Sequence, residues 1–423
     1  MFTKDQQRMN SFQVYATQAA MGRGVSMGIP AKAPNADDPE YVPVYEQLLK
    51  LLDGYASGFP RAKDITGQLA GIPEGAEIEF LKTYYYPEHA KIAIHIPIDR
   101  FAETAEIAQK TGLSEKEARE NLLLMAERVN IFHKVENNVD LWRHIAAFPG
   151  QIAMSTRRLS TEFWAGMGPY MLGYQRPVEY DQEDFAWRWI PASADYVAKG
   201  ELDPCDNVEK MLREARAVAV CACICRSPKP PTAACNRNEP PYEACLQLDD
   251  FADFYVNDLK ISRYLDKDEI EKQIAYNKEH RLAITVSGSQ KSEIICCCCP
   301  DCCGPFDYYK KYGMGGPQHW KATNYYIEKN QAKCTNCGEC VKWCFSQQGQ
   351  ILVGGFAEHR PDRCVGCGIC VQSCPNNALI LRHKKPEECY TYPEDTFDLW
   401  VKQGKDRYGR GADHLPRLSM EKK

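Results

Sequence analysis

Two stretches near the carboxyl end decide the fold of the second half of this chain: residues 334–344 read CTNCGECVKWC and residues 364–375 read CVGCGICVQSCP. Both place four cysteines at the spacing C-x2-C-x2-C-x3-C. Zinc sites usually present two separated pairs of ligands, whereas here four thiols crowd into eleven residues, twice. The spacing therefore predicts two polynuclear metal clusters held by thiolates.

The same spacing occurs in bacterial two-cluster ferredoxins, where the fourth cysteine of each run ligates the cluster of the other run. It predicts two 4Fe-4S clusters with crossed ligand sets. The first ferredoxin site is then made of Cys334, Cys337, Cys340 and Cys374, and the second of Cys364, Cys367, Cys370 and Cys344.

The residues around the two runs fit a small module of short strands. We expect strands at NYYIEK, GQILVGGF, HRPDR and ALILRHK, as in a doubled βαβ unit. Phe345 follows the first run where Pro375 follows the second. Residues 323–385 carry eight Lys or Arg against four Asp or Glu, and this positive surplus favours anionic, thiolate-ligated clusters.

Composition sets the wider frame. The chain has 423 residues, 44% apolar and 26% charged, which is typical of a globular protein with two or three domains. A net charge of −5 gives no general reason to expect nucleic acid or an anionic membrane. All 21 cysteines lie between Cys205 and Cys389, and we find neither an apolar signal region nor a membrane-spanning run. We expect a cytoplasmic protein whose cysteines bind metal.

A second cysteine-rich segment precedes the ferredoxin runs. It predicts at least one further Fe-S cluster, because so many clustered thiols would otherwise oxidise or scavenge metal. The sequence leaves the ligands open: Cys223, Cys225, Cys235 and Cys245 could close a cubane, while Cys296, Cys298, Cys299, Cys302 and Cys303 could replace some of them, hold a second cluster or build a non-cubane one. In an extended ACIC segment the alternate thiols would share one face of a strand.

The N-terminal half predicts a different kind of unit. Residues 104–129 give two helices separated by Gly112, the second opened by a capping box at Ser114. A hairpin with the turn Asn137–Asn138 follows, so the region is winged-helix-like. Nine acidic against seven basic residues between 99 and 143 argue for contact with protein, or for a purely structural role, rather than for duplex DNA. The aromatic-rich region that ends at Trp189 is either core or a cover over a redox centre.

These elements together are similar to a family of 4Fe-4S dicluster proteins of anaerobic bacteria and archaea, over roughly residues 75–385. ACICR and PPYEACLQL match two elements of that family, and IICCCCPDCC matches a third. Cys221 and Cys297 look like additions. The resemblance implies an electron-transfer partner of a larger oxidoreductase, with no substrate fixed.

We therefore expect a multi-domain α+β chain. Its parts are an arm (1–74), a winged-helix-like and aromatic-rich domain (75–200), a Cys-rich Fe-S domain (201–322), a dicluster ferredoxin domain (323–385) and a tail (386–423). Neither a dinucleotide-binding glycine motif nor a P-loop occurs in the sequence.

The leading hypothesis is an electron-transfer subunit, which needs no catalytic residue. The alternative is a reductase whose central cluster binds substrate, with His280, Asp301, Asp307 or His319 as candidate acid-base groups. A cluster-based redox sensor acting through the winged helix is disfavoured by the charge of that region.

Overall fold

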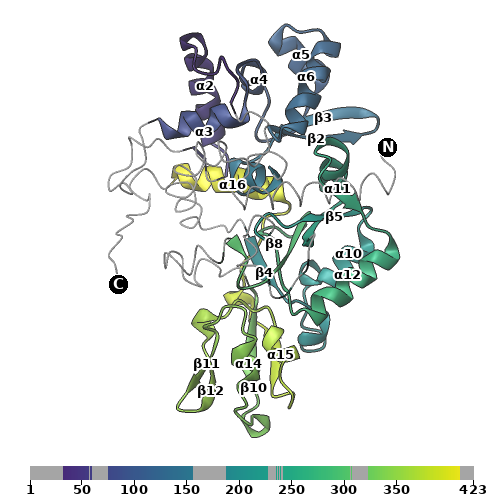
Figure 1. The fold of residues 1–423 in the computed structure, drawn as a ribbon, viewed down its shortest axis with the longest axis vertical. Coiled ribbons are helices and arrows are strands. Elements are labelled where there is room, and N and C mark those ends of the chain that lie inside the picture. Colours follow the sequence, from purple (N-terminus) through teal and green to yellow (C-terminus); the bar gives the residue numbers. More distant parts are fainter. Residues whose placement is uncertain are drawn as a thin grey trace.

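The computed structural model describes residues 32–56, 58–59, 75–155, 187–226, 235, 237, 239, 242–304, 306 and 323–409. Helices gather at one end of Figure 1, a mixed sheet-and-helix body lies in the middle, and a small module of β-ribbons forms the other end. The α+β class expected from the sequence is confirmed. Most of the arm, the aromatic-rich residues 156–186, and Asp307 and His319 lie outside the described residues.

The N-terminal body is mainly helical. Its helices are η1 (Pro39–Tyr41), α2 (Val42–Asp53), α3 (Ala76–Tyr84), α4 (Pro87–Ala93), α5 (Thr104–Thr111), α6 (Glu115–Glu127), the π-helix η3 (Ala147–Gln151) and α7 (Ile152–Met154). A three-stranded antiparallel sheet has the order β1 (Ala102–Glu103), β3 (Val139–His144), β2 (Ile131–Glu136).

The helix-turn-helix-hairpin order predicted here is confirmed. Gly112 ends α5 in the left-handed region (φ 74°), and the Ser114 capping box with Glu117 opens α6. Asn137 and Asn138 connect β2 to β3 with φ of 50° and 64°, which is what a tight two-residue hairpin turn requires.

The chain returns to this body near its end. Helix α16 (Thr396–Gly409) buries Phe397, Leu399 and Trp400 in the N-terminal core. Gly404 lets the helix approach the end of α2 closely, because a Cβ there would overlap the carbonyl oxygen of Gly54. The C-terminal helix is thus part of the core of a body that begins more than 300 residues earlier.

The middle body is a six-stranded antiparallel sheet. Its order is β4 (Trp187–Ile190), β8 (Ala283–Ser287), β9 (Ile294–Cys298), β6 (Glu243–Leu248), β5 (Val218–Ala222), β7 (Arg263–Tyr264). The helices and turns of this body are η5 (Ala194–Tyr196), η6 (Pro204–Asp206), α10 (Val208–Glu214), α11 (Asp249–Asp253), the π-helix η8 (Phe254–Asp258) and α12 (Lys267–Glu279).

The two faces of this sheet have different partners. Along β6, Ala244 and Leu246 share a core with α10 and α12, whereas Cys245 faces the N-terminal core. This alternation follows from the two-residue period of a strand. Cysteines at alternate positions are therefore presented on the face opposite to α10 and α12.

The C-terminal module contains both cysteine runs. Strand β10 (Tyr325–Lys329) pairs with β13 (Leu379–His383), and β11 (Gln350–Val353) with β12 (Phe356–His359), both antiparallel. Its short helices are η9 (Gln331–Lys333), α14 (Glu339–Lys342), η10 (Pro361–Arg363) and α15 (Ile369–Gln372), and η11 (Pro386–Glu388) follows it.

Three of the four expected strands of the module are confirmed, at β10, β11 and β13. The strand expected at HRPDR is wrong: β12 ends at His359, and η10 begins at Pro361. Proline has no N–H to donate and fixes φ, so it starts a helical turn more readily than it continues a strand.

The module is docked directly on the middle body. The N–H of Ala192 donates to the carbonyl of Cys367 at 3.0 Å, and that of Ala198 to the carbonyl of Leu381 at 2.9 Å. Phe345 packs on Trp189 of β4 with 4.6 Å between ring centroids. Among the described residues, no helix is long and apolar enough to cross a bilayer.

Candidate metal centres

The first ferredoxin site is a cavity of about 380 Å³ beside α14. All four cysteines predicted for this site line the cavity: Cys334, Cys337, Cys340 and Cys374. The last of them belongs to the second run. Burial raises the pKa of the Cys340 thiol, and negative charge on the other three thiols would raise it further. The two runs thus meet at one cavity.

The second ferredoxin site is deeper. Cys344, Cys367 and Cys370 are buried, and Cys364 is half-buried. Burial raises the pKa of Cys364 to about 11, and the charge of Cys344, from the first run, adds to the shift. Cys344 has the same effect on the pKa of Cys367 and Cys370, which lie beside it.

The chemistry of both sets fits 4Fe-4S clusters. Buried thiols with raised pKa values are protonated unless a cation replaces the proton, which ligated iron does. Backbone N–H groups also point at the sulfurs, from Gly366 to Cys364 Sγ at 3.4 Å and from Ala378 to Cys374 Sγ at 3.3 Å. Such hydrogen bonds stabilise thiolate ligands.

The cysteines of the middle body gather around a second, larger cavity of about 970 Å³. It lies between the sheet and Ile152 of the N-terminal body, and Trp187 and Trp189 also line it. The cysteines that line it are Cys221, Cys223, Cys225, Cys245, Cys296, Cys297, Cys298, Cys299 and Cys303. We call it the central cavity.

Strand register builds one wall of the central cavity. Cys245 on β6 is directly opposite Cys221 on β5 and Cys296 on β9. Three thiols on adjacent strands therefore form a row across the sheet. Cys223 and Cys225 lie beyond the end of β5, in a turn closed by a 3.1 Å bond from the Arg226 N–H to the Cys223 carbonyl, so the ACIC segment is extended only as far as Ala222.

The thiols of this row are coupled. Hydrogen bonds from Cys221 and Cys296 hold the pKa of Cys245 well below its usual value. Bonds from Cys296 and Cys303 do the same for Cys298. The central cavity is therefore lined by thiols that give up protons readily to a metal.

Three buried polar groups at the central cavity lack a hydrogen-bond partner among the described residues. They are Nη1 of Arg226, the hydroxyl of Tyr255 and Nε1 of Trp187. Each is a donor, and donors left unpaired in a buried site are costly. Sulfide and thiolate sulfurs of an Fe-S cluster would accept from them, so the cavity fits such a cluster.

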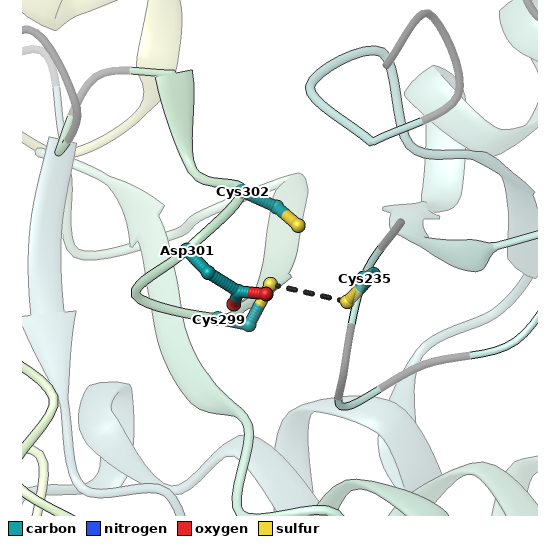
Figure 2. A group of neighbouring side chains, drawn as sticks. All are labelled: Cys235, Cys299, Asp301 and Cys302. Atoms are coloured by element: carbon teal, nitrogen blue, oxygen red, sulfur yellow. Dashed lines mark hydrogen bonds between the residues drawn. The ribbon is translucent and has the colours of Figure 1, made fainter. Parts of the chain in front are cut away.

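A separate, tighter group lies at the end of β9. Figure 2 shows Cys299, Asp301 and Cys302 on one turn facing Cys235, and all four ligand atoms lie within 4.8 Å of one another. We call these four residues the turn site. The quartet of Cys223, Cys225, Cys235 and Cys245 is thus divided, because Cys235 contacts Cys299 and Cys302, whereas Cys245 stands in the thiol row.

The sequence missed three residues that act on these thiols. Cys221, taken as an addition, is part of the row. Gln247 donates to Cys245 Sγ at 3.2 Å and to Cys221 Sγ at 3.5 Å, and its position two residues after Cys245 on one strand could have revealed it. Arg226, 2% exposed, donates to Cys299 Sγ at 3.3 Å and directly follows the ACIC segment.

The candidate acid-base groups are not gathered at the central cavity. His280 stacks on Tyr276 with 3.9 Å between ring centroids, and Asp301 belongs to the turn site.

Comparison with known proteins identifies one part of the chain. Residues 357–380 match the family model of the 4Fe-4S binding domain. No curated protein and no solved structure matches the chain. The match spans the second cysteine run, and the chain therefore contains a ferredoxin-type domain that binds at least one 4Fe-4S cluster.

Proposed function

We propose that this protein passes single electrons to or from a partner oxidoreductase through three Fe-S centres: the two ferredoxin sites and one cluster in the central cavity. Bound clusters supply one-electron chemistry, and the chain supplies spacing, electrostatics and insulation from water. Cys334, Cys337, Cys340 and Cys374 would hold one 4Fe-4S cluster, and Cys364, Cys367, Cys370 and Cys344 the other.

The observation that carries this proposal is the contact between Phe345 and Trp189. Phe345 directly follows Cys344 of the second ferredoxin site, and Trp189 lines the central cavity. Both rings are only 1% exposed, and Phe306 packs on Phe345 at 4.8 Å. The second ferredoxin site and the central cavity are therefore separated by one layer of packed aromatic rings, which excludes water.

The first ferredoxin site is the natural port for a partner. Cys337 is exposed, whereas most thiols of the second site are buried. The adjacent β11–β12 hairpin carries Leu352, Val353 and Phe356, which are 50%, 47% and 61% exposed. Exposed apolar side chains beside a redox centre suit a protein that docks and leaves.

The helix-turn-helix-hairpin unit supports a second contact with the partner. Its helix α6 exposes Leu124, and its hairpin exposes Val135 and Val139. Glu115 and Glu120 are exposed on the same helix, which opposes binding to phosphates. We infer that this winged-helix-like unit contacts protein, and that duplex DNA will not bind it with a steep salt dependence.

Metal analysis of anaerobically prepared full-length protein tests the proposal. Three clusters predict about twelve irons and a similar amount of acid-labile sulfide per chain, whereas the ferredoxin sites alone predict about eight. Fewer than eight irons in folded protein, or no one-electron reduction by a low-potential donor, would refute it. Co-purification with a catalytic oxidoreductase subunit would identify the partner.

The Tyr255 hydroxyl favours one alternative, a reductase whose central cluster binds a substrate. This hydroxyl is buried at the central cavity without a partner among the described residues, where it could donate a proton. Cyanide distinguishes the two functions, because it binds an open iron and leaves a fully thiolate-ligated cluster unchanged. A cyanide-dependent change in the EPR spectrum of the central cluster would favour the reductase.

A further inference from the structure

The turn site differs from the other cysteine groups in its size. Sγ of Cys235 lies 3.5 Å from Sγ of Cys299, and the four ligand atoms of the site fit within 4.8 Å. Among the described residues, the ferredoxin cysteines form no group this tight; they surround an open cavity instead. One structure thus contains two classes of thiol site, one spread around a cavity and one closed.

This difference selects the kind of metal centre. Four ligands at about 2.3 Å from one tetrahedral ion lie about 3.8 Å apart, which is close to the spacing of the turn site. A cubane cluster must fit four irons and four sulfides between its thiolates, and so it holds them further apart. The turn site has room for one ion and not for a cluster.

We propose that the turn site holds a single zinc ion, bound by the thiolates of Cys235, Cys299 and Cys302 and by the carboxylate of Asp301. Thiolates together with one carboxylate, in a closed set of four, are ligands that zinc takes in structural sites. This zinc is additional to the proposed Fe-S centres and takes no part in electron transfer.

Local structure and charge support a bound cation with thiolate ligands. Cys299 and Cys302 are buried on one turn, in which the N–H of Cys303 donates to the Cys299 carbonyl at 3.1 Å. The Arg226 guanidinium donates to Cys299 Sγ at 3.3 Å, and the Arg237 N–H donates to Cys235 Sγ at 3.5 Å. These donors stabilise the sulfurs as thiolates, the form that binds zinc.

The position of the turn site gives the zinc a structural role. It joins Cys235 to a turn 64 residues later in the chain. Two residues after Cys235, the Arg237 guanidinium lies 5.1 Å from the ring centroid of Trp343, and Arg281 lies 4.2 Å from the same centroid. Trp343 immediately precedes Cys344 of the second ferredoxin site. The zinc would therefore fix the middle body against the ferredoxin module.

Metal content and zinc spectroscopy of the full-length protein test this inference. We expect one zinc per chain beside the iron. The zinc absorption edge should show three sulfurs at about 2.3 Å and one oxygen at about 2.0–2.2 Å. Absence of zinc, a single iron in its place, or a disulfide between Cys235 and Cys299 in the isolated protein would overturn the proposal.

Variants identify the ligands. Cys235→Ser should lose at least tenfold in zinc affinity and keep its full iron content, while the matched control Cys389→Ser, outside every cysteine group, should keep both metals. A fall in iron in step with zinc would mean that Cys235 serves a cluster instead, and unchanged zinc would exclude it as a ligand. Iron below eight with zinc intact would refute the electron-transfer function alone.

Cobalt substitution covers the case in which Cys235→Ser does not fold. Co²⁺ in the wild-type turn site should give thiolate-to-cobalt charge-transfer bands and the intense visible bands of tetrahedral cobalt. Asp301→Asn should shift the visible bands and keep the thiolate bands. Octahedral, weakly absorbing cobalt, or an Asp301→Asn spectrum identical to that of the wild type, would contradict the assigned ligand set.

Discussion

The crossed ligand sets of the two ferredoxin sites can be tested with pairs of cysteine substitutions. Cys374 lines the cavity of Cys334, although it lies in the run that begins with Cys364. The double variant Cys334→Ala/Cys374→Ala then removes two ligands from one cluster. The double variant Cys364→Ala/Cys374→Ala removes one ligand from each of the two clusters.

The iron content of the two double variants should therefore differ by a whole cluster. Each 4Fe-4S cluster contributes four irons, so Cys334→Ala/Cys374→Ala should lose about four per chain and Cys364→Ala/Cys374→Ala about eight. Alanine is used because a serine oxygen could still bind iron. The single variant Cys374→Ala should match the first double variant, since both lose the same cluster.

Iron and acid-labile sulfide are measured on anaerobically prepared protein, with circular dichroism as the check on folding and Cys389→Ala as the control. EPR of the reduced protein supplies a second readout, because a lone cluster lacks the spin coupling of a close pair. If Cys334→Ala/Cys374→Ala lost about eight irons and Cys364→Ala/Cys374→Ala only about four, each run would hold its own cluster and our assignment would be refuted.

Three further predictions concern residues outside the cysteine runs. Arg226→Gln should lower the potential of the central cluster by on the order of 100 mV in a redox titration, because it removes a buried cation worth about 2 kcal/mol beside the thiolates; Arg226→Lys should restore most of it. Phe356→Ser should slow electron exchange with the partner several-fold at unchanged iron content, whereas Tyr326→Ser, on another strand of the module, should not. Burial raises the pKa of Glu293 from 4.5 to about 7 despite its hydrogen bond from Thr396. The folded state then binds the extra proton, so stability should fall by about 3 kcal/mol as pH rises from 4.5 to 7, and Glu293→Gln should abolish that fall in urea unfolding.

Local signals in the sequence were enough for the ferredoxin module and for the N-terminal helices. The spacing of a run places its first three thiols within a few residues of one another, whatever the rest of the chain does. The Ser114 capping box and the turn at Asn137 are equally local, because each depends on residues at most three positions apart. Such features can be predicted without knowledge of the tertiary fold.

The central cysteines could not be grouped in this way, because their grouping depends on strand register. Cys245 meets Cys221 on one side and Cys296, 51 residues later in the chain, on the other. A shift of one residue in either pairing would turn the partner thiol to the opposite face of the sheet. Nor does sequence indicate that Cys235 reaches the turn at Cys299.

The replacement of proline by Phe345 after the first run illustrates how packing gives meaning to a departure from a motif. A proline ring at this position could not reach Trp189 and Phe306 as the phenyl ring does. The residue thus fastens the module to the middle body at the point where Cys344 approaches the central cavity. Pro375, which follows the second run, is exposed and has no comparable contact to make. The two nearly identical runs therefore have different tasks: the first ends at an internal interface, and the second ends toward solvent.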